Sequence, residues 1–127
     1  MVIIRPSASA TATTNETGGP AVIILDSATH AREWLTVSTT LYVIQQLLDQ
    51  PSSPARGVEW RIIPVVNPDG YVYSWEKDRL WRKNRRSLPG HCQGVDLNRN
   101  FDVNFGGSSF TAACTTFAAC RASFELL

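Results

Sequence analysis

The stretch AVIILDSATHAREWL, residues 21–35, decides the fold that we expect for this chain. Its first part, residues 21–26, is a continuous apolar run of strand length, which is the pattern of a strand buried on both faces in a parallel sheet. We therefore predict a central strand there. His30 and Glu33 follow its carboxyl end, and open α/β sheets place their ligand sites at that end of the strands.

An amphipathic helix and a second strand are predicted next. From Glu33 onward, apolar residues recur at spacings of three and four, a period that turns one stripe of a helix to the sheet. The stripe consists of Trp34, Val37, Leu41, Ile44 and Leu48. Pro51 should end this helix. VEWRIIPVV, residues 58–66, then predicts a strand parallel to the first, joined to it by a right-handed crossover.

The flanking segments are less regular. VII at residues 2–4 indicates one short strand before a polar loop over residues 6–19. NPDGY, residues 67–71, contains two tight-turn signals, Asn-Pro and Asp-Gly. Residues 74–91 are strongly charged and predict a mixture of short helix and loop. From Gly106 onward neither a helical nor a strand period is visible, so no structure is predicted there.

Composition excludes several broad classes. The 127 residues suit one domain, and 43% hydrophobic with 18% charged residues is ordinary for a soluble folded chain. A net charge of +1 argues against polyanion binding by the whole molecule, although six of the twelve Lys and Arg lie within residues 77–86. No apolar run is long enough to cross a bilayer, and the start lacks a signal-peptide pattern. We expect no membrane partner.

His30 and Glu33 form the first candidate site. Where a chain turns into a helix, residues i and i+3 lie side by side, so this imidazole and carboxylate can reach one metal ion about 2 Å away. Taken alone, the pair also suits an ordinary helix start, because a carboxylate is favoured in the first turn. Catalytic zinc usually takes three protein ligands and a water. The other histidine, His91, lies in a loop-like segment where a surface residue is more common than a ligand.

The basic segment DRLWRKNRR, residues 78–86, allows three interpretations. Its arginines, interleaved with Trp75 and Trp81, could contact the phosphates and bases of a nucleic acid. They could instead form a solvated surface, or one or two of them could clamp a carboxylate or a developing oxyanion. DLNRN, residues 96–100, adds an Asn-Arg pair that could grip a carboxylate in the same way.

Four blocks together carry a family resemblance. THAREWL, NPDGY, DRLWRKNRR and GVDLNRNF follow one another at the distances found in the zinc metallocarboxypeptidases of the carboxypeptidase A and B family, which the sequence resembles over residues 2–107. The resemblance implies an α/β fold, a partial zinc-carboxypeptidase-type mixed sheet with flanking helices. It further implies that residues 1–107 are a fragment of the peptidase catalytic domain and that residues 108–127 are a divergent tail.

The resemblance implies a role for each matching residue. His30 and Glu33 would bind Zn2+. Asp96 would hydrogen-bond the zinc-binding histidine from behind and raise its basicity. Arg82 would hold the oxyanion of the tetrahedral intermediate. Further residues would contact the substrate, namely Arg32 and Arg79 along its backbone or in a subsite, and Asn98 and Arg99 at its terminal carboxylate.

Other family features have no counterpart. The third zinc ligand, the tyrosine that closes over the substrate and the catalytic glutamate are not matched after Phe101, and Glu125 lies too early to be that glutamate. We therefore expect a fragment that binds zinc weakly and is inactive alone. A non-catalytic remnant that binds peptide C-termini is the alternative.

The resemblance also implies properties outside the active site. Peptide or protein C-termini would be the substrates, no nucleic acid would be bound, and the protein would be a secreted monomer, although the chain carries no signal peptide of its own. Three cysteines without CxxC spacing argue against a zinc cluster and leave a disulfide and a spare thiol open. The family's pattern then favours a Cys92–Cys114 bridge.

Overall fold

The computed structural model describes residues 1–88 and 93–102, and these fall into two compact units. The first unit contains residues 1–28 and 34–66, and the second contains residues 29–33 and the chain from residue 67 onward. The strands lie in the first unit, whereas the predicted site residues lie in the second.

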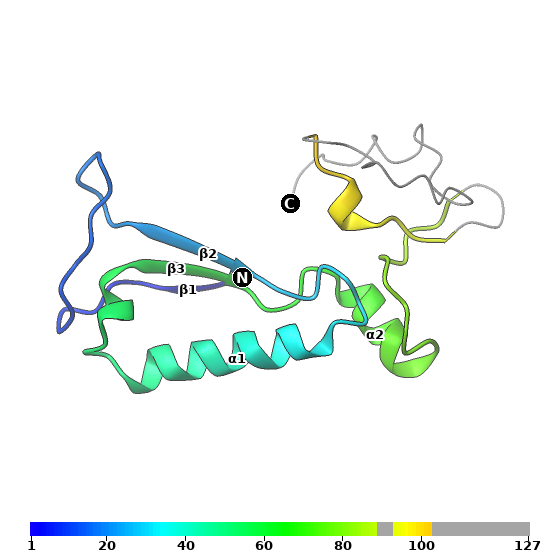
Figure 1. The fold of residues 1–127 in the computed structure, drawn as a ribbon, viewed down its shortest axis with the longest axis horizontal. Helices are drawn as coiled ribbons and strands as arrows, with labels where there is room; N and C mark the ends of the chain where they lie inside the picture. The colour runs from blue at the N-terminus through cyan, green and yellow to red at the C-terminus, as the bar shows by residue number, and fades with distance from the viewer. Residues whose placement is uncertain (89–92, 103–127) are drawn as a thin grey trace. The chain divides into compact units, whose positions relative to one another are not determined.

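The first unit is built on a mixed sheet (Figure 1). Its strands are β1 (Val2–Ile4), β2 (Val22–Asp26) and β3 (Glu59–Ile63), in the spatial order β1-β3-β2. β3 pairs parallel with β2 and antiparallel with β1. The three predicted strands and the parallel pairing across the helical connection are therefore confirmed, and the sheet is mixed as expected.

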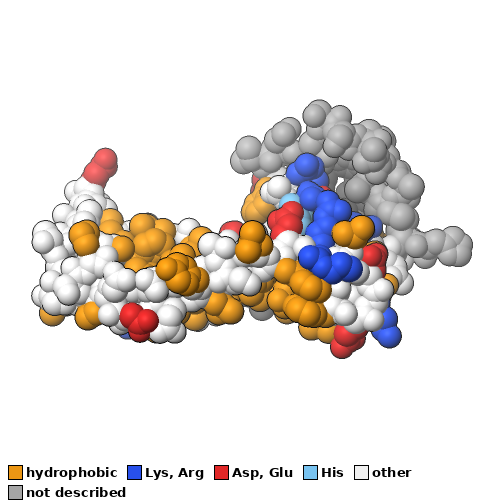
Figure 2. All heavy atoms as spheres, turned by 60° about the horizontal axis from the view of Figure 1, so that its bottom comes forward, with side chains coloured by type: hydrophobic (Ala, Val, Ile, Leu, Met, Phe, Trp, Pro, Cys, Tyr) orange, Lys and Arg blue, Asp and Glu red, His pale blue; other side chains and the backbone are white. Residues whose placement is uncertain are grey.

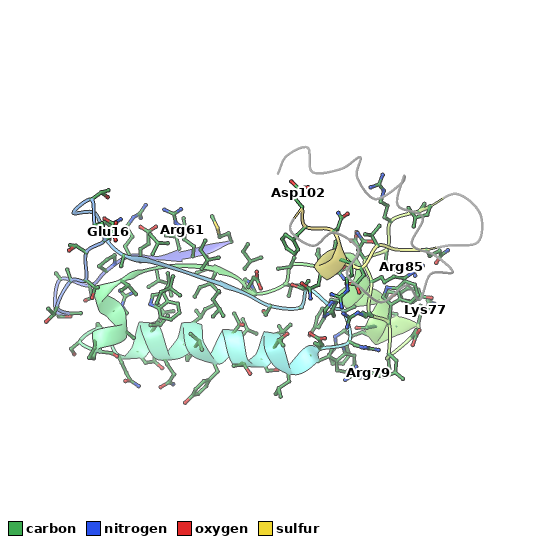
Figure 3. All side chains as sticks on the ribbon, turned by 45° about the horizontal axis from the view of Figure 1, so that its top comes forward. Glu16, Arg61, Lys77, Arg79, Arg85 and Asp102 are labelled. Atoms are coloured by element: carbon green, nitrogen blue, oxygen red, sulfur yellow. The ribbon has the colours of Figure 1, made fainter. Side chains whose placement is uncertain are left out.

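Helix α1 (Trp34–Asp49) covers one face of this sheet (Figure 1). The core consists of Ile4, Leu47 and Ile62, with Leu25, Val43, Ile44 and Trp60 packed against it. Side chains alternate along β3, because successive residues of a strand point to opposite faces. Ile62 is fully buried, whereas its neighbour Arg61 is exposed and lies on the side of the sheet away from α1 (Figure 3).

Two predictions about this unit are wrong. β2 is not central: among the described residues it pairs only with β3, and Val22, Ile23 and Ile24 are 43%, 39% and 70% exposed. An apolar run identifies a strand, but it does not say how many neighbours that strand has. The stripe predicted for α1 is correct at Val37, which is buried, and at Ile44, which packs against the core. It is wrong at Leu41 and Leu48, which are exposed, while the preceding residues Thr40 and Leu47 are buried. Leu47 and Leu48 are adjacent and both apolar, so periodicity alone does not decide which of them is buried. Thr40 is polar, and polarity argues against a core position.

The connection that leaves β2 is tightly fixed. Ser27 donates its backbone N–H to Ile63 and accepts at its carbonyl from Val66, and its hydroxyl donates to the carbonyl of Pro64. Ala28 then adopts a left-handed backbone, with φ of 52°, which is uncommon for a residue other than glycine. This kink ends the strand and turns the chain into the block that contains His30.

NPDGY begins a helix rather than forming two tight turns, so that prediction is wrong. Helix α2 spans Pro68–Glu76, and the Asn67 side chain caps it by accepting a hydrogen bond from the backbone N–H of Gly70. Proline at the first helical position and aspartate in the first turn both suit a helix start. After α2 the charged segment continues without helix to residue 88, and a short 3-10 helix, η2 (Leu97–Arg99), follows.

Within the described ranges, no helix combines the length and the apolar character that crossing a bilayer requires. A second 3-10 helix, η1 (Pro54–Gly57), lies between α1 and β3. The predictions for His91, Cys92, Cys114, Glu125 and the tail from residue 108 fall outside the described residues.

Gly57, at the end of η1, should not tolerate a side chain. Thr13 donates its backbone N–H to the Gly57 carbonyl at 2.8 Å, and a Cβ on Gly57 would collide with the carbonyl oxygen of Thr11. Gly57→Ala should lower the free energy of unfolding by about 1–3 kcal/mol, as overpacking does. Urea denaturation, monitored by tryptophan fluorescence, would measure this change in the free energy of unfolding.

Gly19→Ala is the matched control for this change. A Cβ there meets only the Asn15 side chain, at 3.6 Å or more. Equal stability of the two variants would show that the loop before β2 moves away from Gly57 without cost.

Candidate functional site

Four charged or titratable side chains meet in the second unit: His30, Glu33, Arg82 and Asp96. His30 and Glu33 lie between β2 and α1 in the sequence, Arg82 follows α2, and Asp96 caps η2. Acidic and basic side chains gather on this unit in Figure 2. The cluster therefore unites residues that are up to 66 positions apart in the sequence.

The histidine and the glutamate converge. Glu33 donates its backbone N–H to the carbonyl of His30 at 3.1 Å, which closes a turn before α1 begins at Trp34. Across this turn, Nδ1 of His30 lies 2.9 Å from Oε1 of Glu33. The expected proximity is present, but it comes from a hydrogen-bonded turn and not from the first turn of the helix. The side chain of His30 is 10% exposed and that of Glu33 is 43% exposed.

Asp96 holds the other side of this arrangement. One of its carboxylate oxygens lies 3.2 Å from Nε2 of His30, and the other accepts a hydrogen bond from Nε of Arg82 at 2.9 Å. Burial alone would raise the pKa of Asp96, but the hydrogen bond and charge of Arg82, together with His30 and the backbone N–H of Asn98, hold that pKa below its ordinary value. Asp96 is therefore an anion that fixes both an imidazole and a guanidinium.

The imidazole has a carboxylate oxygen at each nitrogen. A neutral imidazole donates from one nitrogen and accepts at the other. If Nε2–H donates to Asp96, then Nδ1 presents a lone pair to Glu33 Oε1 at 2.9 Å, and two acceptors face each other. Such a pair is stabilised only when a proton or another cation lies on that side of the ring.

A zinc ion fits this pair of donors chemically. Imidazole nitrogen and carboxylate oxygen are common zinc ligands, and two of them at about 2.1 Å in a tetrahedral site would be about 3.4 Å apart. The observed 2.9 Å between Nδ1 and Oε1 needs to open by only a few tenths of an ångström. Within residues 1–88 and 93–102, no group of three or more His, Cys, Asp and Glu is arranged to hold a metal ion. The described site thus contains two candidate ligands.

The predicted arginines are placed as follows. Nη1 of Arg82 lies 3.9 Å from Oε1 of Glu33, so this guanidinium is next to the candidate metal ligands. Nη1 of Arg79 donates to the carbonyl oxygen of Arg32 at 2.9 Å, which ties the segment after α2 to the exposed Arg32. The structure therefore brings Arg82 to the cluster and uses Arg79 to hold the backbone beside it.

Asn98 and Arg99 lie on η2, directly after Asp96. The backbone N–H of Asn98 donates to Oδ1 of Asp96 at 3.1 Å, and Nη1 of Arg99 donates to the carbonyl oxygen of Asn98 at 2.9 Å. The same carboxylate oxygen that contacts His30 thus anchors the start of this short helix. The Asn-Arg pair is consequently attached to the cluster through Asp96.

Aromatic rings stabilise the segment that contains Arg82. The guanidinium of Arg85 lies 3.6 Å from the ring centroid of Tyr73 and 4.5 Å from that of Trp81, and Lys83 lies 5.6 Å from the Trp81 ring. Tyr73 and Trp81 meet edge to face at 5.0 Å. Arg79, Lys77 and Arg85 are labelled in this unit in Figure 3. Two cations of the basic segment therefore lie on aromatic rings, one of which, Tyr73, belongs to α2.

Sequence reasoning missed buried polar residues that support this cluster. Asn67 and Ser74 are each only 2% exposed, and they donate to the backbone on either side of His30. The missed signal was the asparagine before a proline and an acidic residue, which is typical of a helix cap as well as of a turn.

Known proteins with similar sequences include peptidases and proteins named as inactive. The family model described as zinc carboxypeptidase, peptidase family M14, matches residues 1–124. A zinc carboxypeptidase from Simulium vittatum is 39% identical over 115 residues, which are 85% of this chain and 38% of that protein. An inactive metallocarboxypeptidase ECM14 from Ajellomyces capsulatus is 46% identical over 94 residues, covering 68% of this chain and 15% of that protein.

Solved structures agree with these matches. The crystal structure of the carboxypeptidase A from Helicoverpa armigera superposes with a TM-score of 0.68 and 32% identity, covering 89% of this chain and 31% of that one. The chain spans between 15% and 38% of the length of the curated relatives named above. Because the family model matches almost all of its residues, this chain belongs to the zinc carboxypeptidase family, peptidase family M14.

Proposed function

We propose that His30 and Glu33 are two protein ligands of a zinc ion in a site that hydrolyses the C-terminal peptide bond of peptides. The observation that carries this proposal is the imidazole held between two carboxylates, with Nδ1 2.9 Å from Glu33 and Nε2 3.2 Å from Asp96. When bound, zinc supplies a Lewis acid that polarises a carbonyl oxygen. The two carboxylates outnumber the single guanidinium of Arg82, so the cluster favours an added cation.

The other residues of the cluster have roles that follow from their charges. Arg82 is held by Asp96 at 2.9 Å, and its remaining guanidinium N–H groups are available to a developing oxyanion. Asn98 and Arg99 follow Asp96 and are proposed to bind the free carboxylate of a peptide. Desolvating a carboxylate without a partner is costly, so such a pair selects chain ends over internal segments. Arg32 is proposed to contact the peptide backbone, and Arg79 is proposed to belong to a nearby substrate subsite.

We propose that this chain does not turn over substrate by itself. We propose only two ligands among the described residues, where catalytic zinc usually takes three, and we identify no glutamate as the general base in the blocks that carry the resemblance. A boundary between the peptidase fragment and a tail at residue 107, a secreted location and a monomeric state belong to the same proposal. The match to zinc carboxypeptidases over residues 1–124 supports the family assignment on which it rests.

A non-catalytic protein that binds peptide C-termini is the second candidate. Relatives named inactive metallocarboxypeptidase ECM14, one of them 46% identical to this chain, favour it. It requires the Asn-Arg pair but no general base. A nucleic-acid partner is disfavoured, because Arg85 and Lys83 lie on the Trp81 ring that base stacking would need.

A binding and turnover experiment on the purified chain tests the proposal. With added zinc, a peptide with a free C-terminus should bind, its amidated form should not, and hydrolysis should equal the blank. Arg99→Ala should abolish this binding, whereas Arg5→Ala, which removes an exposed arginine from the first unit, should not change it. Calorimetry and an amino-acid release assay provide the readouts. Equal binding of both peptides would contradict the proposal, and robust hydrolysis would contradict the inactivity of the chain.

A further inference from the structure

We propose that Asn67 is a positioning residue that fixes the backbones of His30 and Arg82 relative to each other. The inference rests on the proposed function for the roles of these two residues, but its geometry does not. Asn67 is 2% exposed and caps α2. An amide that is buried to this degree needs partners for its donors and its acceptor.

All of the hydrogen-bonding groups of this amide are used. Nδ2 donates to the carbonyl oxygen of Thr29 at 3.3 Å and to that of Lys83 at 3.1 Å, and Oδ1 accepts from the backbone N–H of Gly70 at 3.1 Å. Thr29 directly precedes His30, and Lys83 directly follows Arg82. One side chain therefore attaches both site segments to the first turn of α2.

Further bonds complete the frame on the other side of His30. Ala31 donates its backbone N–H to the carbonyl of Arg82 at 3.0 Å, and its own carbonyl accepts from the hydroxyl of Ser74, in α2, at 3.2 Å. His30 is thus the middle residue of three, and the residues before and after it are both anchored to α2. A small displacement of the His30 backbone would therefore move Nδ1 away from Glu33 and Nε2 away from Asp96.

Gly70 allows this close approach. A Cβ at Gly70 would meet the carbonyl oxygen of Lys83 and the side chain of Asn67. Gly70 would ordinarily be assigned to a tight turn, but here its lack of a side chain leaves room for Asn67 and for the backbone of Lys83. Both residues serve the contact between α2 and the segment that contains Arg82.

Capping and positioning use different atoms of the same amide. The cap needs only Oδ1, whereas the links to Thr29 and Lys83 need the two N–H donors of Nδ2. Asn67→Asp preserves the shape and the capping oxygen, but it removes both donors and places an oxygen against two carbonyl oxygens. Asn67→Ser keeps a capping oxygen without adding charge, and it is too short to replace the donors.

The experiment reads the ring of His30 directly. The chain has two histidines, so nitrogen-15 imidazole spectra in a His91→Gln background report on His30 alone. A slowly exchanging Nε2–H bound to Asp96 is expected, because Nε2 lies 3.2 Å from a carboxylate oxygen of Asp96. Asn67→Asp should remove this signal and weaken zinc affinity about tenfold, the size of effect seen when a ligand loses an outer partner. Helix content by circular dichroism should not change.

Asn15→Asp is the matched control, because the described side-chain hydrogen bonds of Asn15 in its exposed loop involve only Oδ1, which aspartate keeps. Unchanged His30 spectra in Asn67→Asp would reduce Asn67 to a cap and overturn the inference. If Asn67→Asp does not fold, Asn67→Ser provides the same test. Shifted imidazole signals of His30 in that variant support the positioning role, and unshifted signals overturn it. Absence of zinc binding by the unmodified chain would refute the proposed function, while the ring signals would still test Asn67.

Discussion

Replacing His30 with alanine should abolish measurable zinc binding by this chain. His30 and Glu33 are the two candidate ligands, and their donor atoms are 2.9 Å apart. Loss of an outer partner costs roughly 10- to 100-fold in metal affinity, so loss of one of only two direct ligands should cost more than that. Titration calorimetry with Zn2+ on the metal-free chain would measure the loss. Glu33→Gln should weaken binding in the same direction, because an amide oxygen is a poorer zinc ligand than a carboxylate.

His91→Ala separates two explanations for any loss. It removes the other histidine of the chain and should leave zinc affinity unchanged, since we do not assign His91 as a ligand. If His91→Ala proved as damaging as His30→Ala, the ion would be held by a different ligand set. Retention of full affinity in His30→Ala would refute the site itself.

Ile62→Ala should destabilise the first unit severely. Ile62 is fully buried at the centre of the core, and in the sheet it pairs with Val2 on one side and Leu25 on the other. Truncation of a buried isoleucine to alanine typically costs about 2–5 kcal/mol, through lost transfer energy and the cavity that remains. A core this small has few other contacts to compensate, so we expect a shift of this size in urea denaturation.

Ile24→Ala provides the comparison within the same sheet. Ile24 is 70% exposed and pairs in register with Arg61. Its truncation should change the free energy of unfolding by less than about 0.5 kcal/mol, as surface substitutions usually do. A comparable loss in both variants would mean that another part of the molecule covers β2 in solution.

The sequence predicted the strands and the contact between His30 and Glu33 correctly, because both follow from short local patterns. The apolar runs at residues 21–26 and 58–66 predict strands, and the structure has strands at Val22–Asp26 and Glu59–Ile63. The His-x-x-Glu spacing predicts two neighbouring side chains, and the structure brings them to 2.9 Å. The position of Asp96 behind His30 came from the family pattern and agrees with the observed 3.2 Å contact. The sequence did not predict the second contact of Asp96, the hydrogen bond from Arg82, because that contact depends on how the fold places Arg82 beside the carboxylate.

Other features could not be read because they depend on tertiary neighbours. Periodicity places Leu41 and Leu48 on an apolar stripe, but which of two adjacent stripes is buried depends on where the sheet lies. Whether β2 is central depends on strands elsewhere in the chain. The role that we propose for Asn67 depends on hydrogen bonds to residues 38 and 16 positions away, which no local pattern contains.

The outer side of β2 has a consequence for the behaviour of the chain in solution. In the described part of the chain, this edge of the sheet presents backbone N–H and C=O groups beside Val22, Ile23 and Ile24, with Asp26 as the one charged residue of the strand. Natural proteins protect such edges with lysine, proline or a bulge, since an unprotected apolar edge is a template for intermolecular strand addition. We therefore expect concentrated solutions of this chain to aggregate through the same apolar residues that make β2 recognisable as a strand.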